Sequence, residues 1–286
     1  MDDAAYDTLR NRVLLWAIIG SVRALGPLRR PLAGLVALIW YARQPRPVRR
    51  RAADNHRRFT PALTAVQARG RARASYFQYV AMILDSIRVE PLNDAELRTV
   101  VDVEGEENVA GRNGIMVTSH FGNWDIGMST AHALGLPMTT VMAAIGSTTV
   151  TSLVELSRHR KDFELFTPRQ AARGLLQALR RGRWVGLMLD VPEAGPTVVV
   201  PFCGGLVKVS AVPARLAAAT SLPIVPAACW REGGRWRVRI HPPLPVARHD
   251  DEVSVMAEVA RTLEPEIRRH PEQWYPFHEV YADAPA

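Results

Sequence analysis

The segment VTSHFGNWD, residues 117–125, places a histidine and an aspartate five positions apart at a change of local structure. The apolar residues before it predict a strand that ends at Ser119, and Gly122 permits a sharp turn into a helix. His120 would then lie at the carboxyl end of a strand, with Asp125 in the first helical turn behind it. If Asp125 accepts a hydrogen bond from one imidazole nitrogen, the other nitrogen takes a proton from a hydroxyl group. The pair therefore predicts a general base.

The start of the predicted helix is also suited to negative charge. Asn123 has the side chain of an N-cap, and we expect Asn123 and Trp124 to support the site. The N–H groups of a first helical turn lack intrahelical partners, so they stabilise a phosphate or a developing oxyanion. The spacing H-x-x-x-x-D alone is common, and the chain repeats it at His278 and Asp283, so a structural histidine is the alternative interpretation. Only the first copy lies between a predicted strand and a predicted helix.

Strand-like and helix-like segments alternate through most of the chain. Apolar runs predict strands at residues 115–119, 138–143, 184–190, 197–200, 223–229 and 236–240. Amphipathic segments predict helices at residues 124–134, 150–160, 169–181, 210–219 and 251–269. This order indicates an α/β fold with a central mixed, largely parallel sheet flanked by helices. In such sheets the chemistry lies at the carboxyl ends of the strands.

Positive charge is concentrated in the first quarter of the chain. The 286 residues have a formal net charge of +8, yet residues 1–75 hold 15 Arg and 4 Asp, and the remainder is slightly acidic. This asymmetry indicates an anionic partner at that end, either a membrane surface or a nucleic acid. No helix-turn-helix, zinc or RNA-binding pattern accompanies the arginines, so the membrane is favoured and nucleic acid is not expected.

Two short apolar runs, Val13–Val22 and Leu32–Tyr41, lie in this basic region. Neither reaches the roughly 20 residues that a transmembrane helix needs. The acidic residues near the start of the chain do not fit a signal peptide. Two interfacial helices with Trp16 and Trp40 are therefore predicted, with packing of both helices on the core as the alternative. We expect a membrane-associating region over residues 1–75 and a domain over residues 76–286.

The two cysteines, Cys203 and Cys229, give neither a disulfide framework nor the spacing of metal ligands. Neither has the basic neighbours of a reactive thiol, and the G-x-S-x-G motif of serine hydrolases is absent from the sequence. The residues therefore predict no metal site and no covalent nucleophile.

Five segments together resemble a known family. HFGNWD resembles the HX4D motif of glycerolipid acyltransferases, and four further blocks agree in order and spacing: Gly174–Gly195, Val200–Gly205, Ser221–Ala227 and His270–Tyr281. Over about residues 10–281 the chain resembles the bacterial lipid A lauroyl/myristoyl acyltransferases and the actinobacterial phosphatidylinositol mannoside acyltransferases.

This resemblance implies a glycerolipid acyltransferase-like fold and a monotopic enzyme on the cytoplasmic face of the inner membrane. The enzyme would move a fatty acyl chain from a thioester, acyl-CoA or acyl carrier protein, to a hydroxyl or amine of a lipid or glycolipid. No cofactor and no covalent acyl-enzyme are implied. His120 would be the general base, and Asp125 would orient it.

The resemblance also implies supporting roles for four charged residues. Asp190 and Glu193 lie in the family's acidic loop, although both residue types are also common in turns. Arg158 and Arg160 lie in its basic region and would hold a phosphate of coenzyme A or of the acceptor. A solvated helix end, which favours cations, is the alternative for the two arginines.

Two departures from the family pattern concern the substrates. Glu279 and Val280 follow His278 where two basic residues are usual, and the acidic loop at residues 191–195 is short. An acceptor other than lipid A, including a specialised natural product, is therefore compatible with the chain. A non-catalytic lipid-binding protein on the same fold is the alternative.

Overall fold

The structure, a computed structural model, describes residues 7–143, 147–192 and 195–282. The strands are β1 (Val101–Glu104), β2 (Ile115–Thr118), β3 (Met138–Val141), β4 (Glu164–Phe166), β5 (Trp184–Met188), β6 (Thr197–Phe202), β7 (Gly205–Ser210), β8 (Ile224–Glu232) and β9 (Arg235–Ile240). The α-helices are α1 (Leu9–Ala24), α2 (Arg29–Arg43), α3 (Arg46–Phe59), α4 (Ala65–Val89), α5 (Asp94–Arg98), α6 (Trp124–Ala133), α7 (Thr148–His159), α8 (Ala171–Arg180), α9 (Val212–Thr220) and α10 (Glu252–Arg269).

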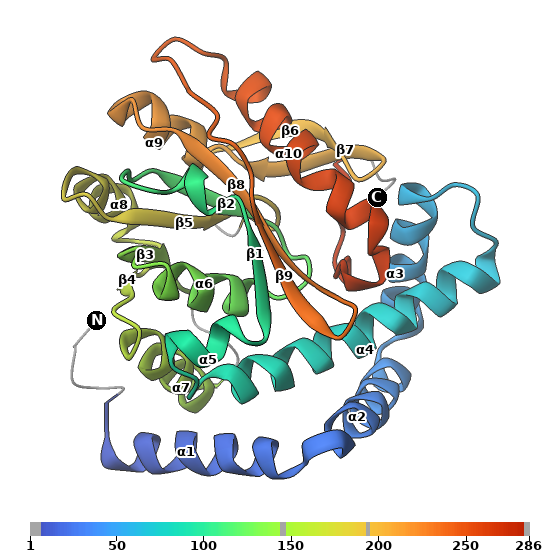
Figure 1. Cartoon of the computed structure of the whole chain (residues 1–286). Coiled ribbons are helices and arrows are strands. Elements are labelled where there is room, and N and C mark those ends of the chain that lie inside the picture. The colour runs from blue at the N-terminus through green and yellow to red at the C-terminus, as the bar shows by residue number, and fades with distance from the viewer. Residues whose placement is uncertain (1–6, 144–146, 193–194, 283–286) are drawn as a thin grey trace.

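Seven strands form the central sheet in the order β1-β9-β8-β2-β5-β3-β4 (Figure 1). β2 pairs in parallel with β5 and β8, and β3 pairs in parallel with β4 and β5. The direction changes once, at the antiparallel pair β8–β9. The predicted mixed, largely parallel sheet is therefore confirmed. β6 and β7 form a separate antiparallel hairpin.

Helices cover both faces of the sheet, and each face has its own core. On one face α8, α9 and α10 pack against β2, β5 and β8 around fully buried side chains such as Ile115, Leu175 and Met256. On the other face α5 and α6 enclose a second cluster that includes Ile126 and Trp184. The central strands β2 and β5 are largely apolar because both of their faces are covered.

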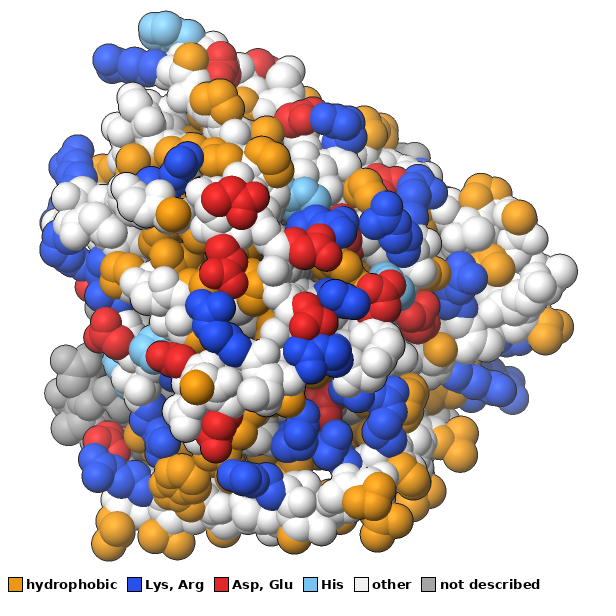
Figure 2. All heavy atoms as spheres, in the orientation of Figure 1, with side chains coloured by type: hydrophobic (Ala, Val, Ile, Leu, Met, Phe, Trp, Pro, Cys, Tyr) orange, Lys and Arg blue, Asp and Glu red, His pale blue; other side chains and the backbone are white. Residues whose placement is uncertain are grey.

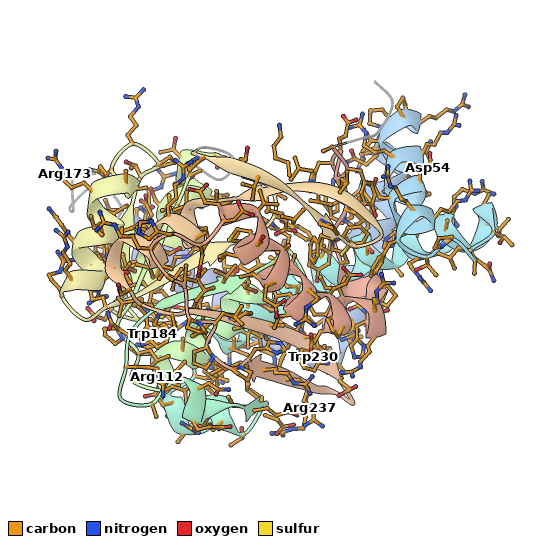
Figure 3. The ribbon with its side chains drawn as sticks, turned by 90° about the horizontal axis from the view of Figure 1, so that it is seen from above. Asp54, Arg112, Arg173, Trp184, Trp230 and Arg237 are labelled. Atoms are coloured by element: carbon orange, nitrogen blue, oxygen red, sulfur yellow. The ribbon has the colours of Figure 1, made fainter. Side chains whose placement is uncertain are left out.

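The N-terminal helices lie along one side of the molecule. α1, α2 and α3 all pack against the long helix α4, and alanines such as Ala52, Ala68 and Ala72 permit close approach in that layer. Seen from above, α3 with Asp54 and α8 with Arg173 lie at opposite ends of the molecule (Figure 3). α4 runs without interruption from Ala65 to Val89, so the predicted boundary at residue 75 falls inside this helix.

α1 and α2 bury one side and expose the other. Leu15 and Ile19 of α1 are buried, whereas large apolar side chains of both helices face outward. These exposed residues are Leu9, Val13, Trp16, Leu32, Leu35, Val36, Leu38 and Ile39. Figure 2 shows hydrophobic side chains along the lower margin of the molecule, where α1 and α2 lie in Figure 1. None of the helices in the described part of the chain has the length and apolar character to cross a bilayer.

Most predicted elements are present, and the differences have local causes. The sequence does not predict the short strands β1 and β4, because acidic residues such as Asp102 and Glu164 break up their apolar residues. The helix predicted from Ser210 begins instead at Val212, because residues 205–210 pair with β6.

Candidate active site

The register of two neighbouring strands brings His120 and Asp190 together. In the parallel pair β2–β5, Thr118 lies opposite Met188, so the residues two positions further on also meet at the carboxyl edge. The backbone N–H of His120 donates to Asp190 Oδ1 at 2.9 Å, and His120 Nδ1 lies 3.1 Å from the same oxygen. Burial alone would raise the pKa of Asp190, but the charge of His120 and these hydrogen bonds lower it below its ordinary value.

The turn after His120 depends on Gly122. Its φ of +63° is in the left-handed region, and a Cβ at this position would lie 1.8 Å from the carbonyl oxygen of Cys229. The C-terminal segment crosses the same turn. The N–H of Gly122 donates to the carbonyl of Gln273 at 2.8 Å, and the Tyr275 hydroxyl donates to the carbonyl of Gly122 at 2.8 Å. The turn that carries His120 is therefore held from two sides.

Asp125 occupies the first turn of α6, as the sequence predicts, and its carboxylate faces a guanidinium group. Arg158 Nη2 lies 3.4 Å from Asp125 Oδ1, and the Arg158 side chain is largely buried. The sequence predicts that Asp125 bonds one of the two imidazole nitrogens of His120, and in the structure Asp190 contacts one of them, Nδ1. Asp125 thus positions Arg158, and its predicted role as the orienting partner of His120 stays a prediction.

Asn123 and Trp124 support the histidine in different ways. Asn123 is fully buried and caps α6, accepting from the N–H of Ile126 at 3.0 Å, as the sequence predicts. Its Nδ2 donates to the carbonyl of Met82, and Ser86 Oγ donates to its Oδ1, so it also fastens α6 to α4. Trp124 packs edge-on against the His120 ring, with 5.1 Å between the ring centroids.

Arg158 and Arg160, the two arginines of the predicted basic region, lie in different surroundings. Arg158 contributes to the lining of the cavity beside His120. Arg160 instead lies over the ring of Trp16, 4.6 Å from its centroid, and approaches Glu90 at 3.8 Å. Arg160 therefore helps to hold α1. Glu193 lies outside the described residues.

His278 is a further residue of the site region, which sequence reasoning treated only as part of a repeated spacing and of the C-terminal signature. It interacts electrostatically with both Asp190 and His120, and burial lowers its pKa, with His120 and Arg51 acting in the same direction. It lines a cavity of 420 Å³ together with Asp190, Lys208 and Glu279. The signature His270–Tyr281 was the signal that could have identified it.

A cavity of 910 Å³ opens beside His120, within the range of about 300–1,000 Å³ usual for small-molecule sites. Its titratable and charged lining residues include His120, Arg158, Asp190 and Arg215. Apolar side chains from both sides of the sheet's edge form much of the rest, including Met116, Met128, Leu134, Leu175, Leu176 and Leu187. The cavity therefore combines a basic group with a long apolar wall.

Backbone strain is present next to Asp190. Val191 has a φ of +56°, a conformation that is strongly disfavoured for a β-branched residue. Val191 lines both cavities, as Asp190 does. Strain of this kind is common where a structure positions a functional group.

The cysteine thiols do not offer a nucleophile. Cys203 and Cys229 are both buried, and burial raises the pKa of each thiol above its ordinary value. A thiol with a raised pKa is not a thiolate at neutral pH. Within the described ranges, no group of three or more His, Cys, Asp or Glu side chains is arranged to hold a metal ion.

The fold and the site define a class of protein. Residues 5–282 match the family model of the bacterial lipid A biosynthesis acyltransferases. The chain belongs to this family, and it is an acyltransferase of lipid biosynthesis. The resemblance indicated by its five sequence segments is thereby confirmed.

Two of the relatives that align with this chain are phosphatidylinositol mannoside acyltransferases. A phosphatidylinositol mannoside acyltransferase of Mycolicibacterium smegmatis is 26% identical over 213 residues, which is 71% of this chain and 69% of the relative. The phosphatidylinositol mannoside acyltransferase of Mycobacterium tuberculosis is 28% identical over 171 residues, or 58% of this chain. That alignment spans 54% of the relative, about half of its length.

Among solved structures, the 1-acyl-sn-glycerophosphate acyltransferase PlsC of Thermotoga maritima aligns with 92% of this chain and 99% of its own. The sequence identity is 14% and the TM-score is 0.44, so no residue role is transferred from it.

Proposed function

We propose that this protein transfers a fatty acyl chain from a thioester, acyl-CoA or acyl carrier protein, to a hydroxyl group of a lipid or glycolipid, with His120 as general base. The observation that carries the proposal is the bond between Asp190 and His120 Nδ1 at the edge of a large apolar cavity. An imidazole that donates Nδ1–H to a carboxylate has its basic lone pair on Nε2. Such a base activates a hydroxyl group near neutral pH.

The reaction balances without a covalent enzyme intermediate. His120 takes the proton of the acceptor hydroxyl while its oxygen forms a bond to the thioester carbonyl carbon. The tetrahedral oxyanion then collapses, the carbon–sulfur bond breaks, and the departing sulfur takes the proton from the imidazolium. The first turn of α6, beside His120, supplies N–H groups and the positive end of a helix dipole for the oxyanion.

The lining of the cavity supports a place for each of the two substrates. Its apolar wall suits the hydrocarbon chain of the donor, because burying methylene groups is favourable by about 0.8 kcal/mol each. Arg158, held by Asp125, suits a phosphate of the donor or of the acceptor. A glycolipid acceptor is supported by the phosphatidylinositol mannoside acyltransferases among the relatives.

The enzyme would work from the cytoplasmic face of the cell membrane without crossing it. The exposed apolar residues of α1 and α2, flanked by arginines, support binding to an anionic lipid surface. Leu35, at 55% exposure, is part of that face. Leu35→Glu should reduce sedimentation with vesicles that contain phosphatidylglycerol. Val66→Glu, at an exposed position of α4 outside that face, is the matched control and should sediment normally.

Acyl transfer is tested by incubating the purified protein with a panel of acyl-CoA and acyl carrier protein thioesters and measuring released thiol. The proposal expects release that requires a total lipid extract and yields a labelled lipid product. Release that is equally fast without lipid would indicate a thioesterase and contradict the proposal. A protein that binds acyl chains but releases no thiol from either class of donor would be the non-catalytic lipid-binding protein.

A further inference from the structure

Four arginines interact with a single aspartate, Asp85, where α2, α4 and β8 meet, and a fifth, Arg23 of α1, lies near one of them. Asp85 of α4 is 3% exposed in its side chain and bonds Arg29 Nε at 3.0 Å and Arg231 Nη1 at 2.8 Å. The guanidinium groups of Arg30 and Arg88 interact electrostatically with Asp85, Arg29 and Arg231, and that of Arg23 interacts with Arg88. We call Arg23, Arg29, Arg30, Arg88 and Arg231 the arginine cluster.

The single carboxylate of Asp85 neither balances the positive charge of the arginine cluster nor bonds all of its guanidinium groups. In the part of the chain that the structure describes, no acidic side chain bonds Arg30 or Arg88. The Nε of Arg88 is buried without a hydrogen-bond partner, and Arg30 lies 5.3 Å from the ring centroid of Phe77. Burial and the neighbouring guanidinium groups lower the pKa of both side chains. A buried donor without a partner and an excess of like charge are both costly, so the cluster is suited to an anion.

The first turn of α2 adds to this unbalanced charge. Arg29 and Arg30 begin the helix, no acidic residue lies in its first turn, and no side chain caps it. Cations are unfavourable at a helix N-terminus, where the dipole is positive. An anion bound there would meet both the helix dipole and the guanidinium groups.

The arginine cluster lies next to the exposed apolar face of α2, and this position indicates the source of the anion. Leu28 precedes Arg29 and is 64% exposed, and Leu32 and Leu35 continue the exposed apolar face of α2. Figure 2 shows basic side chains gathered over α4, directly above the apolar lower margin. A lipid whose chains contact the exposed side chains of α2 would have its phosphate near Arg29 and Arg30, which begin the same helix.

We infer that the arginine cluster binds the phosphate group of a membrane lipid, at a site separate from the acyl-transfer centre. Arginine suits this task because its planar fork donates to two phosphate oxygens at once. Arg29 and Arg231 are fixed by Asp85, whereas no described acidic side chain bonds Arg30 or Arg88 and the Nε of Arg88 has no hydrogen-bond partner. The site would fix the depth and orientation of the protein on the bilayer.

The test is thermal unfolding of the full chain in phosphate-free buffer of constant ionic strength, titrated with monomeric dihexanoyl phosphatidylglycerol. We expect the Tm of the wild type to rise by about 5 °C when the lipid is about 100-fold above its Kd. In Arg30→Gln/Arg88→Gln this rise should disappear. Because the substitutions relieve like-charge repulsion, the Tm without lipid should be equal to that of the wild type or higher.

Arg57→Gln/Arg69→Gln is the matched control, since it removes two exposed arginines of the same basic region and should keep the lipid-dependent rise. A rise that persists in Arg30→Gln/Arg88→Gln, or that is absent from the wild type, would overturn the inference. Inorganic phosphate in place of the lipid separates the two sources of the anion. An equal rise at equal concentration would overturn the lipid assignment, and a much smaller rise would support it. None of these readouts requires acyl transfer.

Discussion

Asp190 contacts His120 twice, through the backbone N–H at 2.9 Å and through Nδ1 at 3.1 Å, although the two residues are 70 positions apart. The first contact fixes the end of β2 relative to β5, and the second sets the orientation of the imidazole ring. A carboxylate in this place also stabilises the imidazolium that forms when the base takes a proton.

Asp190→Asn should lower kcat by about 10²- to 10⁴-fold, because the imidazole loses its orienting carboxylate. The acidic limb of the pH–rate profile should also move to lower pH, since a protonated His120 is no longer stabilised by a negative charge. The measurement is kcat against pH with saturating thioester and acceptor. Asp125→Asn is the comparison, and it should act chiefly on KM through the loss of its contact with Arg158. If Asp125→Asn instead reproduces the pH shift and Asp190→Asn does not, the assignment of the carboxylate is wrong.

Substitution of Arg158 should affect catalytic efficiency, whereas substitution of Arg160 should affect stability. Arg158→Gln should reduce kcat/KM by about 10- to 100-fold, the effect of losing one charge-assisted hydrogen bond to a substrate. Arg160→Gln should leave kcat/KM close to that of the wild type and lower the free energy of unfolding by about 0.5–1 kcal/mol, because it loses its contact with Trp16. Steady-state kinetics and chemical denaturation of both variants test this. A larger kinetic loss in Arg160→Gln would place the phosphate contact elsewhere.

Gly122→Ala should destabilise the protein by about 3 kcal/mol or more, because the new Cβ overlaps the carbonyl of Cys229 as well as straining φ. Gly111→Ala is a matched control: its φ of +65° is nearly the same, and nothing lies within 4 Å of the added Cβ. That variant should lose only about 1–2 kcal/mol, the cost of the left-handed conformation. Urea denaturation of the two variants measures the difference, and equal losses would show that the close approach is unimportant.

The buried His56 should make stability depend on pH. Burial lowers its pKa to about 3, its Nε2 contacts Ser75 Oγ at 3.0 Å, and its Nδ1 is buried without a hydrogen-bond partner. The unfolded chain binds this proton near pH 6.5 and the folded chain does not, so stability falls as the pH decreases from 6.5 towards 3.

The slope from this single group is about 1.4 kcal/mol per pH unit. Denaturation of the wild type and of His56→Gln between pH 7.5 and pH 5 should give a flatter pH dependence for the variant. Parallel dependences would mean that folding does not lower the pKa of His56.

The sequence predicts the strand, turn and helix around His120 because apolar periodicity, a glycine and an N-cap residue are local signals. Gly122 and Asn123 accordingly have the roles that their types indicate. The sheet class follows in the same way from the alternation of segments. β7 was missed because its six residues end at Ser210, a residue type that also begins helices.

The partner of His120 depends on information that is not local. Asp125 is near in sequence and has the right residue type, but the contact to Nδ1 comes from the strand that pairs with β2. The order of strands in a sheet cannot be predicted from periodicity. For the same reason, periodicity does not predict that His120, Asp190 and His278 lie near one another. The separation of Arg158 from Arg160 has the same origin, since it depends on where α1 packs.

The most direct test of the account is acyl transfer by His120→Ala. The variant should keep the circular dichroism spectrum of the wild type, because Asn123, Gly122 and the C-terminal segment hold the turn without the imidazole. With a thioester and an acceptor that the wild type uses, its kcat should fall by at least about 10²-fold. A folded His120→Ala protein with wild-type turnover would contradict the account, because the proton would then be taken by another group.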